Sequence, residues 1–345
     1  MTRQINVGSV HVGGGAPVSI QSMCNTKTTD VEGSLDQIKA LYTAGCEIVR
    51  LTVPTLEAAE AFGIIAAQSP LPLVADIHFD YRCAIAAAEN GAAKIRINPG
   101  NIGGEDRVKA VVDCCKAHHI PIRVGVNGGS LEKELLEKYG HPTPEALVES
   151  AFGHIRLLEK YGFYDTCISM KSSSVPLMME AYRLFAARSD YPLHVGVTET
   201  GTEYMGTVKS AMGIGGLLCM GIGDTIRVSL TADPVKEVEA GKAILKAAGL
   251  RKEGVNIVSC PTCGRTQIDL IGLANRVEEA LKDCPKPITV AVMGCVVNGP
   301  GEAREADVGV AGGDGCGVLF VKGELRERLP YDQLLPALLR YVDSL

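Results

Sequence analysis

The sequence predicts an α/β protein in which a (β/α)8 barrel of the TIM type is followed by a small α+β domain. Over residues 17–248, short runs rich in Val, Ile and Thr alternate eight times with helical stretches rich in Ala, Leu, Glu and Lys. Strands that alternate with helices indicate parallel βαβ units, and eight such units close into a barrel. A break at 249–254 begins and ends with glycine, and neither the period nor the composition continues beyond it.

The eight expected strands are short and apolar. They cover residues 18–23, 47–53, 71–77, 93–98, 120–127, 166–171, 193–198 and 225–230. Helical patterns separate them, for example at 34–44, 56–68, 107–118 and 234–248. An open doubly wound sheet is the alternative, but eight strands without a dinucleotide-binding glycine fingerprint favour the barrel.

The stretch after the break predicts a separate domain. Strands are expected at 256–259, 288–293, 307–311 and 318–321, with helices at 268–282 and 332–342. The chain has 345 residues, which exceeds one average domain. We therefore expect two domains, residues 1–250 and 255–345.

Composition limits the function classes. The formal net charge of −6 and the low aromatic content of 5% argue against nucleic acid as a partner. The N-terminus lacks a signal-peptide pattern, and no apolar run is long enough to span a membrane. The chain has 12 cysteines, which in a cytoplasmic protein favours metal or redox chemistry over disulfides. A cytoplasmic location without membrane contact is expected.

Polar residues interrupt the expected strands. Four strands carry an arginine among β-branched neighbours: Arg50, Arg96, Arg123 and Arg227. Three other strands end in charged residues: Asp76 with His78 on the first, Lys171 on the second and Glu199 on the third. Because side chains alternate along a strand, Arg96 and Asn98 share one face. A single inward arginine could be an ion pair of the core, but several converging cations indicate a bound polyanion.

Asp76 and Glu199 are the carboxylates among these cations. Each could neutralise an arginine, and each could also carry protons beside a bound phosphate. His78 could hydrogen-bond a ligand or serve the structure alone.

The second domain opens with Cys260-Pro-Thr-Cys263, and Cys295 follows in Met-Gly-Cys-Val-Val-Asn-Gly-Pro-Gly-Glu302. Zinc is one interpretation, with Cys284, Cys316 or a carboxylate as its fourth ligand, and a thioredoxin-like redox pair is another. Three cysteines and a replaceable oxygen ligand, Glu302, favour an iron–sulfur cluster. The barrel cysteines are expected to be small buried hydrophobic residues: Cys24, Cys46, Cys83, Cys114, Cys115, Cys167 and Cys219.

These two cysteine motifs, together with Lys94-Ile-Arg-Ile-Asn-Pro-Gly-Asn101 and Arg123-Val-Gly-Val-Asn-Gly-Gly-Ser-Leu131, closely resemble the 4-hydroxy-3-methylbut-2-enyl diphosphate synthase family. The resemblance covers nearly the whole chain, in the compact two-domain bacterial form. It implies the reductive ring opening and dehydration of 2-C-methyl-D-erythritol 2,4-cyclodiphosphate to (E)-4-hydroxy-3-methylbut-2-enyl diphosphate in the non-mevalonate isoprenoid pathway. Ferredoxin or flavodoxin would supply the electrons.

The resemblance also implies roles for individual residues. The ligands of a 4Fe–4S cluster would be Cys260, Cys263, Cys295 and Glu302, and release of Glu302 would free one iron for substrate. The diphosphate would be bound by Arg50, Arg96, Arg123 and Lys171, with Asn98 and Asn127 nearby, and Glu199 would assist proton transfer. Further residues match the lining of the family's site less securely: Asp76, His78, Arg227, Ser229 and Asn298.

Chain geometry predicts a head-to-tail homodimer, in agreement with the family. The last barrel helix runs away from the carboxyl ends of the strands, where barrel sites lie. A six-residue linker spans at most about 22 Å, roughly the length of one barrel helix. The second domain would therefore reach a partner's site more readily than its own.

Two other functions remain open from the residues alone. A zinc-stabilised barrel lyase acting on a phosphorylated sugar would keep the arginines and make the cysteines structural. A non-enzymatic RNA-binding protein with a zinc ribbon is disfavoured by the net charge.

Overall fold

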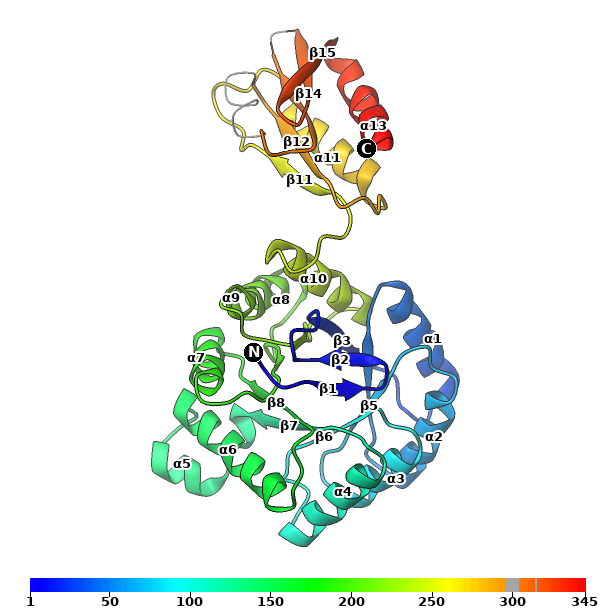
Figure 1. Ribbon diagram of the computed structural model, residues 1–345, viewed down its shortest axis with the longest axis vertical. Helices are drawn as coiled ribbons and strands as arrows, with labels where there is room; N and C mark the ends of the chain where they lie inside the picture. Colours follow the sequence, from blue (N-terminus) through cyan, green and yellow to red (C-terminus); the bar gives the residue numbers. More distant parts are fainter. Residues whose placement is uncertain (296–303, 314) are drawn as a thin grey trace. The chain divides into compact units, whose positions relative to one another are not determined.

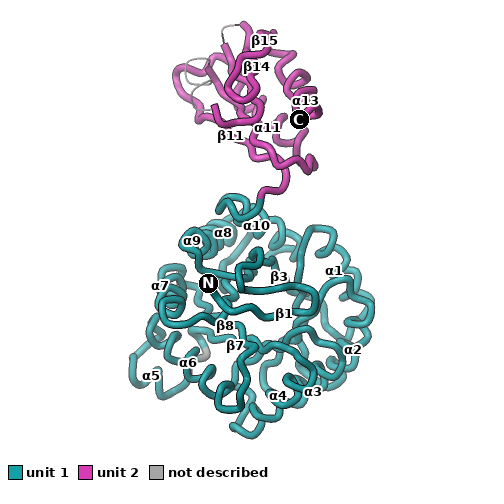
Figure 2. The backbone as a smooth tube through the Cα atoms, viewed as in Figure 1, with its two compact units in different colours: residues 1–251 teal, residues 252–345 magenta. Residues whose placement is uncertain are grey.

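A computed structural model describes residues 1–295, 304–313 and 315–345. The chain divides into two compact units, Met1–Arg251 and Lys252–Leu345 (Figure 2). Among the described residues, no helix is long and apolar enough to cross a membrane.

The first unit is a closed parallel barrel, which confirms the predicted fold class. Its strands are β3 (Ser19–Met23), β4 (Ile48–Thr52), β5 (Leu73–Asp76), β6 (Lys94–Ile97), β7 (Ile122–Asn127), β8 (Thr166–Lys171), β9 (His194–Val195) and β10 (Thr225–Ile226). They pair in the order β8-β7-β6-β5-β4-β3-β10-β9. A parallel bridge between Ile168 and Leu193 joins the first strand of this order to the last and closes the ring.

Helices surround the barrel (Figure 1). They are α1 (Val31–Thr43), α2 (Leu56–Ala66), α3 (Tyr81–Glu89), α4 (Glu105–Ala117), α5 (Lys133–Tyr139), α6 (Pro144–Lys160), α7 (Val175–Ala186), α8 (Glu203–Ser210), α9 (Gly216–Cys219) and α10 (Pro234–Ala247), with a π-helical turn at Ala211–Gly215 and a 3-10 turn at Gly128–Ser130. Side-chain caps fix several starts: Thr55 accepts from the Ala58 N–H and Thr143 from the Ala146 N–H.

The strands have an inverted polarity that positions the site. Their outward residues, such as Ile95, Ile122 and Ile168, belong to the large core formed with the helices. Because neighbouring residues of a strand face opposite ways, the residues between them point into the barrel. Those inward residues include Arg96 and Arg123, so the barrel interior is polar and charged where most such barrels are apolar.

A short hairpin that the sequence analysis missed closes the amino end of the barrel. Strands β1 (Ile5–Val7) and β2 (Val10–Val12) pair antiparallel, and the hairpin lies across the barrel (Figure 1). The hairpin packs its apolar side chains onto Ile48, Val74 and Cys167 from the strands. Strands of three residues are too short to give a clear alternating pattern.

In the part of the second unit that the structure describes, a five-stranded mixed sheet packs with two α-helices, and a 3-10 turn lies at Tyr331–Gln333. Its strands are β11 (Asn256–Ser259), β12 (Thr289–Met293), β13 (Val308–Gly312), β14 (Cys316–Val321) and β15 (Glu324–Pro330), and its helices are α11 (Leu270–Leu281) and α13 (Leu334–Ser344). The first three strands are parallel and the last two antiparallel. Both helices share one core with the sheet through residues such as Leu273, Val292 and Leu338. Strand β15 is largely exposed and highly charged, so the sequence did not reveal it.

Two expectations need correction. The strands predicted at 193–198 and 225–230 pair over only two residues each, since the chain leaves the ladder at Gly196 and Arg227 to form the loops of the site. Cys219 is exposed at the end of α9, where burial was expected, and Cys114 is only partly buried.

Candidate functional site

Four basic side chains and one carboxylate meet inside the barrel near the carboxyl ends of the strands. We call Arg50, Arg96, Arg123 and Lys171, with Asp76, the cationic centre. All five are at least nine-tenths buried. Arg96 Nη1 lies 3.0 Å from Asp76 Oδ1, and Arg50 Nε lies 3.6 Å from Asp76 Oδ2. Burial alone would raise the pKa of Asp76, but Arg50 and Arg96 overcome it and hold that pKa at about 2.

Among the described residues, no carboxylate pairs in this way with the other two cations of the centre, Arg123 and Lys171. Arg123 is 1% exposed, and its Nε and Nη1 atoms have no hydrogen-bond partner among the described residues. Burial, followed by the repulsion of neighbouring arginines, lowers the pKa of both Arg123 and Lys171 well below the ordinary value. A buried guanidinium with unused donors is costly. The arrangement therefore suits an anionic ligand, which would supply the missing acceptors.

Two glycines make room for these side chains. A Cβ atom on Gly125 would lie 2.6 Å from Arg96 Nε, and one on Gly196 would lie 2.9 Å from Lys171 Nζ and 2.6 Å from the carbonyl oxygen of Arg227. Any other residue would displace the cations. Glycine at both positions is thus a requirement of the site.

Arg227 is held differently from Arg123. Its Nη2 atom lies 2.9 Å from Glu237 Oε1 on α10. The hydroxyl of Ser22 donates to the other oxygen of Glu237 at 3.1 Å. Arg227 therefore enters the barrel with its charge already paired. His78 is about half exposed, and its Nε2 atom lies 3.9 Å from Asp76, at the edge of the centre.

A cavity of about 490 Å³ opens beside the centre at the carboxyl ends of β7 and β8. Asn127, Lys171 and Glu199 line it, together with Thr198. With its amide oxygen turned toward Arg96, Asn127 accepts a hydrogen bond from Nη2 at 3.3 Å. Three of the residues singled out from the sequence thus share one cavity.

Glu199 sits in this cavity with a strained backbone. Its φ of 54° lies in the left-handed region, which non-glycine residues rarely adopt. The loop is fixed on both sides: the Thr198 N–H donates to the Ser172 carbonyl at 3.3 Å, and the Thr200 hydroxyl donates to the Ser229 carbonyl. Strain of this kind is typical of functional sites. Glu199 is exposed and lines this cavity.

The remaining barrel residues lie around the centre. Asn98 is 5% exposed, and its side-chain oxygen accepts from the Gly100 N–H at 3.1 Å, which shapes the loop after β6. Ser229 lies in the loop after β10, partly buried. Sequence reasoning did not single out Lys94 and His194, which are completely buried on inward positions of β6 and β9. Lys94 could have been found, since it precedes Arg96 by two residues and so shares its face.

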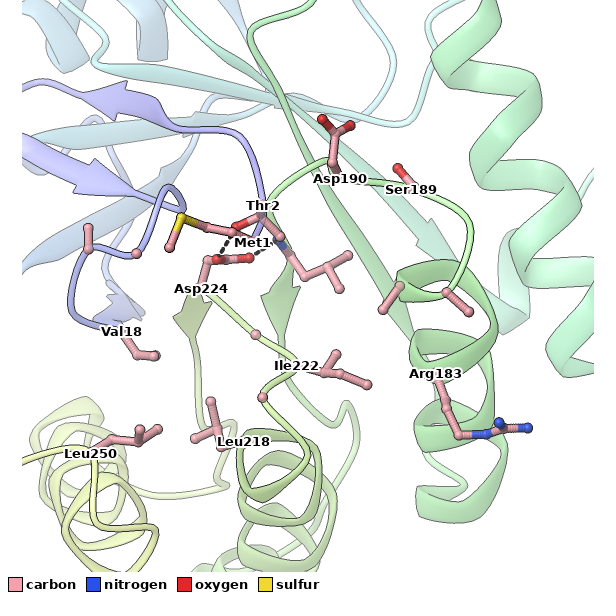
Figure 3. Close-up of a pocket in the computed structure, with 17 residues that line it drawn as sticks. Met1, Thr2, Val18, Arg183, Ser189, Asp190, Leu218, Ile222, Asp224 and Leu250 are labelled. Atoms are coloured by element: carbon pink, nitrogen blue, oxygen red, sulfur yellow. Dashed lines mark hydrogen bonds between the residues drawn. The ribbon is translucent and has the colours of Figure 1, made fainter.

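A second cavity, of about 710 Å³, lies at the amino ends of the strands (Figure 3). Its lining is mostly apolar, with Asp224 as a partly buried carboxylate. Asp224 accepts from the Thr2 hydroxyl at 2.5 Å and from the Leu193 N–H at 2.7 Å, so both oxygens are used (Figure 3). Arg183 also lines this cavity, but unlike Arg123 its guanidinium is exposed and paired with Glu180.

In the second unit, Cys260 and Cys295 follow the carboxyl ends of two neighbouring strands. Strands β11 and β12 are parallel neighbours, with Ser259 opposite Val292, so Cys260 and Cys295 follow at the same end. The Gly294 N–H donates to the Cys260 Sγ at 3.2 Å, and the Gln267 N–H donates to the Gly294 carbonyl at 3.2 Å. The two cysteine segments are therefore bound to each other. Hydrogen bonds to sulfur are a usual feature of iron–sulfur sites.

The three cysteines differ in exposure. Cys295 is 8% exposed, Cys260 is partly buried and Cys263 is exposed. The Arg265 N–H, followed by the Arg265 side chain, lowers the pKa of Cys263 and so favours its thiolate. Asn298 and Glu302 lie outside the described residues. Within the described ranges, no group of three His, Cys, Asp or Glu side chains stands ready as a metal site.

Taken together, the fold and site define a two-domain protein with a barrel whose interior is cationic and a second domain that bears the cysteine motifs. Residues 2–242 match the model of the GcpE TIM-barrel domain, and residues 256–344 match that of the GcpE protein C-terminal domain. The chain therefore belongs to the GcpE family, as its motifs indicated.

Two full-length relatives are named 4-hydroxy-3-methylbut-2-en-1-yl diphosphate synthase (flavodoxin). The protein from Clostridium perfringens is 59% identical over 344 residues, covering 100% of this chain and 99% of the relative. The protein from Geobacter sulfurreducens is also 59% identical, covering 100% and 98%. The chain is thus a member of a family of diphosphate synthases and, like them, an enzyme.

Solved structures share only the barrel fold. A dihydropteroate synthase from Stenotrophomonas maltophilia aligns with a TM-score of 0.53 at 13% identity, covering 72% of this chain and 100% of that one. An N-acetylneuraminic acid synthetase from Leptospira borgpetersenii aligns with a TM-score of 0.52 at 12% identity, covering 82% and 99%.

Proposed function

We propose that this chain reduces 2-C-methyl-D-erythritol 2,4-cyclodiphosphate to (E)-4-hydroxy-3-methylbut-2-enyl diphosphate, a step of the non-mevalonate route to isoprenoids. The relatives' shared name supports the product. The observation that carries the proposal is the cationic centre, where Arg123 keeps two buried nitrogens without a partner among the described residues. A diphosphate supplies the acceptors that these nitrogens lack.

The reaction balances with two electrons and one proton. One carbon–oxygen bond of the cyclic diphosphate breaks and opens the ring, and the hydroxyl on the adjacent carbon departs as water. A double bond then joins these two carbons of the substrate. The diphosphate changes from a ring to a monoester and gains one negative charge. A site with more cations than carboxylates therefore favours the product charge as well as the substrate charge.

In this proposal the cationic centre binds the diphosphate. Arg123 and Lys171 contact its oxygens directly, and Arg50 and Arg96 do so while Asp76 keeps their guanidinium groups in place. The amides of Asn98 and Asn127 complete the polar lining. His78, Arg227, Ser229 and Asn298 are assigned to the outer lining.

Glu199 is proposed to carry the proton. It lines the same cavity as Lys171, it is exposed there, and the loop that bears it is fixed on both sides. A carboxylate at such a position can hold a proton near the departing hydroxyl.

Cys260, Cys263 and Cys295 would hold a 4Fe–4S cluster, with Glu302 as its fourth and replaceable ligand. The donor set fits, since three thiols follow one sheet edge and the Cys260 sulfur already accepts an N–H. When bound, the cluster would supply single electrons and a Lewis-acidic iron for the departing oxygen. Flavodoxin is the proposed electron donor because the relatives' names specify it, with ferredoxin as the other candidate.

A head-to-tail homodimer is also proposed. Within the first unit, Arg251 donates to the carbonyl of Val18 and pairs with Glu47, and both residues precede strands. The chain thus leaves the barrel at the end opposite the cationic centre. Mixing an Arg123→Ala chain with a Cys295→Ala chain should restore activity in hybrid dimers, and absence of rescue would count against the exchange.

The function is tested by anaerobic iron and sulfide analysis with turnover of the cyclic diphosphate. Wild type should contain about four irons per chain and form the allylic diphosphate with reduced flavodoxin. Glu302→Ala should retain iron but change the electron paramagnetic resonance signal seen on adding substrate. A zinc-containing, colourless protein would instead support the alternative, a zinc-stabilised barrel lyase acting on a phosphorylated sugar.

A further inference from the structure

Two more basic side chains lie in the barrel interior, nearer the amino ends of the strands than the cationic centre. We call Lys94 on β6 and His194 on β9 the lower basic layer. Both are completely buried. Each alternates with an outward residue of the helix-facing core, Ile95 and Val195, so both point inward.

The polar atoms of this layer are unpartnered. Lys94 Nζ and both ring nitrogens of His194 have no hydrogen-bond partner among the described residues. The same holds for the Gln21 amide and the Thr225 hydroxyl on neighbouring inward positions. Buried polar groups are normally satisfied, so an exception of this size in one place calls for an explanation.

The charges that face the layer are mostly of its own sign. Lys94 faces Arg123 from the neighbouring strand β7, Arg50 from β4 and the Cys167 thiol from β8, while the hairpin below presents apolar side chains. His194 faces Arg123, Lys171, Lys94 and Arg50. The carboxylates of the interior are already used, Asp76 by Arg50 and Arg96, and Glu237 by Arg227.

These surroundings disfavour a charge on either side chain. Burial lowers the pKa of Lys94 to about 8; Cys167 opposes this, and Arg123 and Arg50 add to it. Burial and the same cations lower the pKa of His194 well below its usual value. An anion in the centre above them offsets the positive field of the arginines and so favours both charged forms.

We propose that Lys94 and His194 are further members of the anion site, which take up protons when a diphosphate enters the cationic centre. The inference rests on the proposed function, since it requires that the centre binds a diphosphate. It assigns a role to two residues that the reaction itself leaves unused. It also makes diphosphate affinity depend on pH without any direct contact between the layer and the ligand.

The direction follows from linkage. A group whose pKa rises on binding takes up a proton between its free and bound pKa values, and affinity falls as pH rises through that range. For Lys94 the range extends upward from about 8 toward the ordinary 10.5. For His194 it lies below the ordinary 6.5. The two residues can therefore be separated by pH.

The test is isothermal titration of the full-length protein with inorganic pyrophosphate, in pairs of buffers that differ in heat of ionisation. At about pH 8.5, wild type should take up at least about half a proton per chain more than Lys94→Met. At about pH 6, the difference should instead appear against His194→Gln. Protonation of pyrophosphate itself is common to all proteins and cancels in these differences.

Lys94→Arg guards against a folding defect, because it keeps the cation but cannot release its proton. Because pyrophosphate and the other cations titrate in both proteins, the ratio of wild-type to Lys94→Arg affinity is the readout, and it should fall by up to about tenfold per pH unit through the range in which Lys94 loses its proton. Lys39→Met, whose side chain is 68% exposed on α1, should match wild type throughout. Equal proton uptake by wild type and both Lys94 variants would overturn the inference. Absence of pyrophosphate binding by wild type at every pH would overturn the proposed function with it.

Discussion

Arg96 and Asp76 lie 3.0 Å apart on neighbouring parallel strands, with both side chains almost completely buried. The register places them opposite each other, so their contact is fixed by the sheet itself. Arg50 reaches the second oxygen of the same carboxylate. Asp76 thus stabilises two guanidinium groups that would otherwise repel each other in a medium of low dielectric constant.

Replacing Asp76 by Asn should destabilise the barrel strongly. Removing one partner of a buried ion pair leaves an uncompensated charge, at a cost of about 3–5 kcal/mol in the free energy of unfolding. Urea denaturation would measure it, with the exposed Asp36→Asn on α1 as the control. A loss below about 1 kcal/mol would show that the two arginines do not depend on this carboxylate.

The same carboxylate predicts a pH dependence. The pKa of Asp76 falls from 3.8 to about 2 on folding, so its contribution is present above pH 3.8 and is lost as pH falls through 2. Unfolding curves of wild type and Asp76→Asn should therefore converge at strongly acidic pH. A constant difference between them across this range would contradict the assignment.

Gly196→Ala should abolish pyrophosphate binding. The new methyl group would collide with the Arg227 carbonyl and the Lys171 ammonium, which forces Lys171 away from the cavity. Gly153→Ala on α6 is the matched control, since nothing lies within 4 Å of its Cβ position. That control should bind normally and gain about 0.5–1 kcal/mol from helix propensity. Undiminished binding by Gly196→Ala would exclude Lys171 from the anion site.

Glu199→Gly should make the enzyme more stable and less active. Glycine adopts a φ of 54° without strain, which relieves roughly 1 kcal/mol, and it removes the carboxylate proposed to carry the proton. Glu199→Gln keeps the strain and should match wild-type stability while losing activity. Thermal unfolding and turnover on the same preparations would separate the two effects, and an active Glu199→Gly enzyme would rule out the proton-carrying role.

Iron content should depend on Cys260, Cys263 and Cys295, and should not depend on Cys219. Anaerobic reconstitution of Cys260→Ala, Cys263→Ala and Cys295→Ala should each leave little bound iron, because a cluster then has too few thiolates. Cys219→Ala, which removes an exposed cysteine of the barrel, should bind iron as wild type does. Full iron content in any of the first three would remove that residue from the ligand set.

Much of this fold could be read from the sequence because the outward strand residues are consistently apolar. Outward apolar residues such as Ile95, Ile122 and Ile168 indicate the strands, and the polar residues that alternate with them indicate the barrel interior. The candidate site was predicted for a related reason, since a buried arginine is rare, and the structure buries three of the four predicted arginines, Arg50, Arg96 and Arg123.

Other features depend on contacts that the sequence does not encode locally. The left-handed backbone of Glu199 arises from hydrogen bonds to Ser172 and Ser229, far away along the chain. The pairing of Arg227 with Glu237 joins the loop after β10 to α10, which packs against β3. His194 gave no signal, because a single histidine in an apolar strand is usually structural.

The hairpin β1–β2 has a consequence for how ligands reach the barrel interior. It covers the amino end of the barrel with Ile5, Val7 and Val12, and so closes the interior at that end. In the proposed reaction, substrate and product would therefore enter and leave at the carboxyl ends of the strands. In this proposal, product must leave the site before the next substrate molecule can bind.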